Sequence, residues 1–243
     1  MNREQQLAEA FVGLTDTLAE DFDPVVLLDR LARHCVEIVG AHDVGIMMAT
    51  ARGGLRTMAV SGESAALVEM FRLQSGQGPC LDCYRTGRPV DVADLGGIAD
   101  RWPELVPLAV RAGYRAAHAL PLRAGDRTIG AVNLLLAAPG GLPAADLRLA
   151  QALADVAALA LIHYRADQAG TGDILTRVQS ALAGKAAVEM ATGMLAERGG
   201  LDLTRALHAL QSYCRANGLR LTDTAQALVR RDLDANSVLS LLN

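Results

Sequence analysis

Aromatic side chains are scarce in this 243-residue chain, at 3% of the total, with a single tryptophan. Single-stranded nucleic acids are commonly bound by stacking bases on aromatic rings, so the composition argues against that mode of binding. Long apolar runs are also lacking. The longest, residues 152–162, is interrupted by Asp155 and is too short to span a bilayer. Charged residues spread through the first twenty positions exclude the apolar core of a signal peptide, and we therefore expect a cytoplasmic protein.

Cysteine and lysine are also rare. Four cysteines in a chain of this length do not form the disulfide framework of a small secreted domain. Lys185 is the only lysine among 23 basic residues, and the net charge is −4, which argues against a general polyanion binder. Residues 1–172 hold 15 basic and 20 acidic side chains, and residues 173–243 hold 8 and 7. The two parts therefore differ in charge, −5 against +1, and a local basic face in the second part remains open.

Periodicity predicts a mixed fold for the first part. Apolar residues at helical spacing indicate helices over residues 3–21 and 24–40, and again over 143–164. Between them, short apolar runs bounded by turn residues indicate five strands, several of them antiparallel neighbours. The expected strands cover residues 44–50, 55–60, 89–92, 114–122 and 128–136. We therefore predict an α+β fold, an antiparallel sheet with flanking helices.

A helix is expected to begin at Asp173 and to end at Gly199-Gly200. Its residues follow an imperfect heptad pattern, which runs through Ile174, Val178, Ala181, Lys185, Val188, Thr192 and Leu195. Two interpretations remain open: a helix that packs on its own domain, or a two-chain coiled coil that makes a homodimer. Two further helices are predicted, capped by Asp202 and by Thr222. A three-helix unit this small buries only a thin core, so we expect its function to depend on its exposed surface.

The surface of this unit carries arginines and almost no lysine. The expected exposed residues are Arg198, Arg205, Arg215, Asn217, Arg220, Arg230 and Arg231. An arginine fork can donate two hydrogen bonds to one phosphate. The alternative to phosphate binding is an ordinary solvent-exposed surface, on which the arginines offset the dipoles of the helices. A DNA-binding helix-turn-helix is less favoured, because no helix has the Asn, Gln, Arg and Ser content of a recognition helix.

Residues 188–229 resemble the ANTAR domain of transcription antitermination regulators. The resemblance covers Ala191, Gly193, Met194 and Leu195, the apolar positions 206–210, Tyr213, Arg215, Asn217, Leu221 and Ala225. It implies a three-helix module that binds RNA stem-loops in nascent transcripts and prevents a terminator hairpin from forming. The implied RNA-binding residues are Thr192, Arg198, Arg215, Asn217 and Arg220, and Arg215 and Asn217 are the candidates for reading unpaired bases. The family usually has a lysine at the position of Thr192, so weaker, less salt-dependent binding is expected.

The first part resembles a GAF domain. The matching segments are residues 76–80, 85–90, 118–122 and 129–133. This resemblance implies a fold that senses a small ligand or a redox state, and the order GAF then ANTAR is typical of actinobacterial regulators. The expected organisation is a sensor domain over residues 1–165, a helical linker over 166–185 and an ANTAR-like domain over 186–243. The cofactor, if any, is not indicated.

Cys80, Cys83 and His118 are the candidate ligand- or redox-sensing residues. Three interpretations remain open for the cysteines: packed core thiols, a redox pair activated by a helix N-terminus that lowers the pKa of Cys80, or a metal site. A metal site would need four ligands, completed by His118, His34 or His42. The cysteines also invite comparison with free methionine sulfoxide reductases, but no catalytic residue can be assigned. A non-enzymatic regulator is therefore the leading hypothesis, and the reductase and a DNA-binding regulator are the alternatives.

Overall fold

The computed structural model describes residues 2–15, 22–62, 64–163 and 174–240. The chain divides into two compact units, one of residues 1–17 and 27–179 and one of residues 18–26 and 180–243. No helix within the described ranges is both long and apolar enough to cross a membrane. Residues 16–21, residues 164–165 of the expected sensor domain, residues 166–172 of the expected linker and the expected cap Asp173 lie outside the described ranges.

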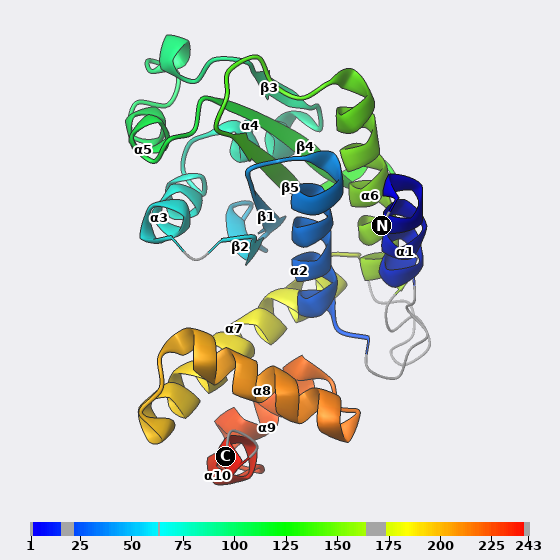
Figure 1. Cartoon of the computed structure of the whole chain (residues 1–243), viewed down its shortest axis with the longest axis vertical. Coiled ribbons are helices and arrows are strands. Elements are labelled where there is room, and N and C mark those ends of the chain that lie inside the picture. Colours follow the sequence, from blue (N-terminus) through cyan, green and yellow to red (C-terminus); the bar gives the residue numbers. More distant parts are fainter. Residues whose placement is uncertain (1, 16–21, 63, 164–173, 241–243) are drawn as a thin grey trace. The chain divides into compact units, whose positions relative to one another are not determined.

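The first unit is built on one five-stranded antiparallel sheet (Figure 1). The strands are β1 (Asp43–Ala49), β2 (Leu55–Val60), β3 (Val90–Val92), β4 (Ala116–Ala124) and β5 (Arg127–Leu136), in the spatial order β2-β1-β5-β4-β3. Nearly every residue of the central strands β1, β4 and β5 is buried, because helices cover both faces of the sheet. The predicted antiparallel α+β fold is confirmed.

Helices pack on both faces. On one side, α6 (Ala144–His163) lies against β4, and α1 (Arg3–Thr15) packs on α6. The helix α2 (Pro24–His34) continues as a π-helical turn, Cys35–Val39, that contacts β1 and α6 and ends at Gly40 in the left-handed conformation. The other face carries α3 (Ala65–Leu73), α4 (Pro79–Thr86) and α5 (Leu105–Arg111).

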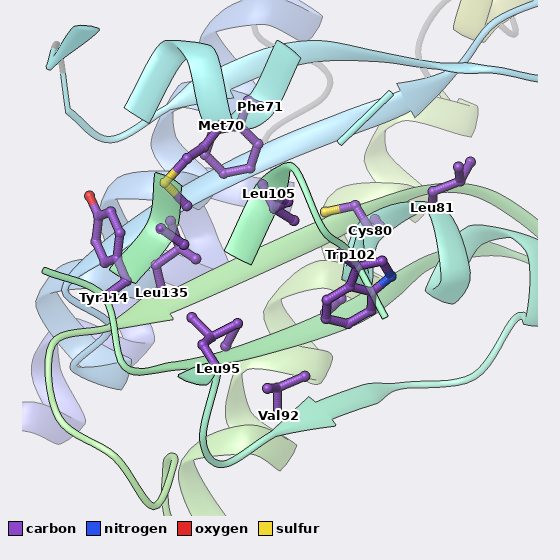
Figure 2. Close-up of a cluster of buried hydrophobic side chains, with 14 of the residues drawn as sticks. Met70, Phe71, Cys80, Leu81, Val92, Leu95, Trp102, Leu105, Tyr114 and Leu135 are labelled. Atoms are coloured by element: carbon purple, nitrogen blue, oxygen red, sulfur yellow. The ribbon is translucent and has the colours of Figure 1, made fainter. Parts of the chain in front are cut away.

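A cluster of apolar side chains fills the space between the sheet and α3, α4 and α5 (Figure 2). Trp102, the single tryptophan, is 2% exposed within it and is therefore a core side chain. The ring of Phe71 rests directly on Gly45 of β1. A Cβ atom added at Gly45 would lie 1.9 Å from Cζ of Phe71, so only glycine permits this arrangement.

The second unit is helical. Its elements are α7 (Ile174–Gly199, of which residues from Ser180 belong to this unit), α8 (Leu203–Asn217), α9 (Leu221–Arg230) and α10 (Ala235–Leu239). Val188 and Leu195 of α7 pack with Leu210 of α8 and Leu228 of α9 in one core. These heptad positions of α7 are thus buried within a single chain, which supports the interpretation that the helix packs on its own domain.

Asp23, which belongs to this unit, accepts two backbone hydrogen bonds. Its Oδ1 accepts a hydrogen bond from the backbone N–H of Val25 at 2.9 Å, and its Oδ2 accepts one from that of Thr222 at 2.7 Å. The prediction that Thr222 caps the third helix is wrong, because α9 begins at Leu221 and its N-cap residue, Arg220, makes no side-chain capping bond. A carboxylate distant in the sequence takes over that role, and no local signal could reveal it.

Replacing this carboxylate should weaken the second unit. We expect Asp23→Ala to lower the free energy of unfolding by about 1–2 kcal/mol, the usual cost of removing a cap, because two backbone donors lose their acceptor in a buried setting. Denaturant unfolding measures the loss, and hydrogen exchange at the Thr222 amide localises it. Asp126→Ala, at an exposed turn position, is the matched control, and an equal effect of both variants would contradict the capping role.

Candidate functional site

The two cysteines of α4 lie in the core. Cys80 and Cys83 are both 0% exposed and belong to the apolar cluster under α3, α4 and α5. Burial, with a smaller contribution from Cys83, raises the pKa of the Cys80 thiol well above its usual value, and burial raises the pKa of Cys83 to about 12. Of the three interpretations, this burial favours packed core thiols, because removal from water disfavours the charged thiolate. Neither thiol presents a reactive thiolate near neutral pH.

His118 lies on the opposite face of the sheet. It alternates along β4 with Ala117 and Ala119, which face the cysteine cluster, and side chains alternate between faces along a strand. Its Nε2 accepts a hydrogen bond from the backbone N–H of Leu142 at 3.0 Å, so Nδ1 carries the ring hydrogen and donates to Oδ1 of Asp91 at 2.9 Å. The expected grouping of His118 with Cys80 and Cys83 is thus not formed.

A metal site is not found in the part of the chain that the structure describes. No three His, Cys, Asp or Glu side chains gather there in a way that could hold an ion. Both ring nitrogens of His118 are engaged, and the cysteines of α4 are protonated core residues.

A buried polar pair in the same cluster was missed by sequence reasoning. Gln74 and Asn133 are both 0% exposed. Nδ2 of Asn133 donates to Oε1 of Gln74 at 3.0 Å, and the backbone N–H of Cys80 donates to the same oxygen at 3.4 Å. Nε2 of Gln74 and Oδ1 of Asn133 have no hydrogen-bond partner. The sequence contained one signal of this pair, since Asn133 is the only polar residue between Ile129 and Leu136 in an otherwise apolar strand.

In the second unit, three of the predicted residues lie close together in the chain, where α8 ends and α9 begins. Arg215 and Asn217 are exposed on the last turn of α8, and Arg220 precedes α9. Nη2 of Arg215 donates to Oγ of Ser212 at 3.1 Å, and Nδ2 of Asn217 donates to the Tyr213 carbonyl at 2.8 Å. We call Arg215, Asn217 and Arg220 the Arg–Asn corner. An open pocket of about 460 Å³ adjoins it, lined by Tyr213, Gly218, Leu219, Arg220, Asp223, Thr224, Ala227 and Leu233.

The other two predicted residues lie elsewhere. Arg198 is in the last turn of α7, where its Nε donates to Oδ1 of Asn236 at 3.3 Å. Thr192 is 8% exposed and its hydroxyl donates to the Val188 carbonyl of its own helix. The expectation that Thr192 occupies a phosphate-facing surface position is therefore corrected: it is a buried residue whose hydroxyl is already satisfied.

Comparison with known protein families identifies a domain type in each of the two parts of the chain. Residues 23–162 match the family model of the GAF domain, and residues 176–229 match that of the ANTAR domain. Since the first match spans more than half of the chain, the protein belongs to the GAF domain family. With the ANTAR domain following, it has the organisation of a GAF and ANTAR domain-containing transcription regulator.

Solved structures resemble the first unit. The GAF domain of a phosphoenolpyruvate-protein phosphotransferase from Coxiella burnetii has 17% identity and a TM-score of 0.53 over 68% of this chain and 98% of that chain. The corresponding domain from Acinetobacter has 11% identity and a TM-score of 0.52 over 70% and 99%. Free methionine-R-sulfoxide reductase from Neisseria meningitidis has 18% identity and a TM-score of 0.49 over 75% and 93%. At such identities the likeness extends to the fold alone. No curated protein sequence matches the chain.

Proposed function

We propose that this protein is a cytoplasmic regulator of transcription antitermination, in which the GAF domain senses a small ligand or a redox state and the ANTAR domain binds stem-loop RNA in nascent transcripts. The observation that carries the proposal is the Arg–Asn corner, whose three polar residues flank one helix junction within the ANTAR-matched residues.

The chemistry of the corner suits RNA. The guanidinium groups of Arg215 and Arg220 can each donate two hydrogen bonds to one phosphate. Asn217 is exposed, and its hydrogen bond to the Tyr213 carbonyl orients its amide. An oriented amide can read the edge of an unpaired base, the element that sequence-specific RNA recognition usually targets.

A homodimer would place two ANTAR domains on one transcript, and effective concentration would then raise affinity for paired stem-loops. Because Val188, Thr192 and Leu195 are buried within one chain, a dimer would need a different surface. The native mass of the purified protein tests this part of the proposal.

RNA titration tests the binding surface. An RNA with two consecutive stem-loops should bind the full-length protein much more tightly than duplex DNA of equal length. Arg215→Ala should weaken RNA binding about tenfold, the loss expected for one charged hydrogen-bonding contact. It should also flatten the salt dependence by about 0.7–0.9 in log–log slope, the share of one phosphate contact.

Arg205→Ala is the matched control, because Arg205 is an exposed arginine in the first turn of the same helix. Its replacement should change RNA affinity little. Equal weak binding of RNA and DNA would refute RNA recognition, and equal losses in the two variants would refute the role of the corner.

A further inference from the structure

We infer that Gln74 and Asn133 form the polar end of a ligand site in the GAF domain, which takes a small, flat molecule with a neutral carboxamide or lactam group. This inference rests on the proposed sensing function and names the chemical class of its ligand.

The hydrogen bonds around Gln74 determine which atoms are left for a ligand. Because the Cys80 N–H and Nδ2 of Asn133 are both donors, the atom of Gln74 that receives them is its oxygen. Gln74 therefore offers Nε2 as a donor, and Asn133 offers Oδ1 as an acceptor. Both atoms are buried without a partner, a situation that costs free energy and that a complementary group would relieve.

This pattern selects among ligand groups. A carboxamide or lactam presents one acceptor and one donor side by side and satisfies both atoms. A carboxylate has acceptors only and would leave Oδ1 of Asn133 unpaired. An ammonium group has donors only and would leave Nε2 of Gln74 unpaired. Of these three groups, the neutral amide is the one that pairs both atoms.

The apolar part of the ligand would replace a core side chain that packs beside Asn133. In the sheet register, Asn133 lies between Gly45 of β1 and Ala119 of β4, which have the two smallest side chains. The Phe71 ring occupies the space above Gly45, next to Met70 on the same helix (Figure 2). A ring-sized ligand would take the place of Phe71 and carry its amide toward Asn133.

Benzamide is the probe, with toluene as its matched control, because the two share a ring and differ in the amide. In titrations of the full-length protein, we expect benzamide to bind about tenfold or more tighter than toluene, as a site with buried polar groups discriminates against an analogue that leaves them unpaired. Asn133→Leu and Gln74→Met should each remove most of this preference, whereas Gln77→Met, in the same turn, should keep it.

Phe71→Ala provides a second measurement if either of these variants fails to fold. Removal of the competing ring should tighten benzamide binding and leave its preference over toluene intact. Equal affinities for the two probes in the wild-type protein or in Phe71→Ala would overturn the inference, as would binding of neither. The amide pair would then be a structural element of the core, satisfied by water.

RNA titration of the same samples separates this inference from the proposed function. Normal RNA binding without discrimination between the probes would reject the ligand site alone. Discrimination between the probes without RNA binding would reject the RNA-binding function and leave the site intact.

Discussion

Above about pH 9, the free energy of unfolding is expected to fall by roughly 1.4 kcal/mol per pH unit for each fully buried thiol. Burial raises the pKa of Cys35 from 9.0 to about 12, and it also raises the pKa of Cys80 and of Cys83. Unfolded thiols ionise near 9, whereas these folded thiols keep their protons. The unfolded state then binds fewer protons, so stability that is present below pH 9 is lost as the pH rises toward the folded pKa.

Guanidinium unfolding between about pH 8 and 10 tests this expectation in the range where free thiols titrate. Burial and the hydrogen bond to Asp43 also raise the pKa of Tyr114, which adds a further loss above about pH 10. The control is Cys35→Ala, which should reduce the slope of stability against pH by one thiol's share. An unchanged slope in that variant, or a flat pH profile in the wild-type protein, would show that these thiols are accessible to water.

Gly45→Ala is expected to destabilise the GAF domain by about 1–3 kcal/mol, as other additions to a packed core do. Its Cβ would lie 1.9 Å from Cζ of Phe71, so the ring would have to leave its position. Phe71→Ala alone should cost about 3–5 kcal/mol through the cavity that it leaves. In that background the clash is absent, and Gly45→Ala should cost little, which gives a coupling energy above about 1 kcal/mol.

Gly13→Ala is the matched control for this cycle. Gly13 lies inside α1 with open space around it, so alanine there should stabilise the helix by about 0.5–1 kcal/mol. Thermal or denaturant unfolding of the four cycle members measures the coupling. An equal cost of Gly45→Ala with and without the Phe71 ring would mean that this contact does not exist in solution.

Much of the fold could be predicted from local pattern. The strand expected over residues 55–60 is β2 (Leu55–Val60), and the helix expected over 143–164 is α6 (Ala144–His163). These elements were predictable because hydrophobic period and turn residues are local properties of the chain. The two domain types were likewise recognisable from short motifs, and both family matches confirm them.

The candidate sites could be predicted only in part. Arg215 and Asn217 stand at a helix end that local signals mark, so their exposure followed from the sequence, whereas Arg220 is partly buried. The burial of Thr192 did not follow from the sequence, because whether a residue of α7 faces the core depends on where α8 and α9 pack.

The sequence by itself determined the antiparallel strands, the helices and the succession of a GAF domain and an ANTAR domain, because these depend on the type and spacing of residues close in the chain. Only the tertiary structure decided that Cys80 is a protonated core thiol, that His118 points away from it and that Gln74 meets Asn133. Burial, pKa and hydrogen-bond partnership depend on residues far apart in sequence, and they exist only once the sheet and its covering helices have packed together.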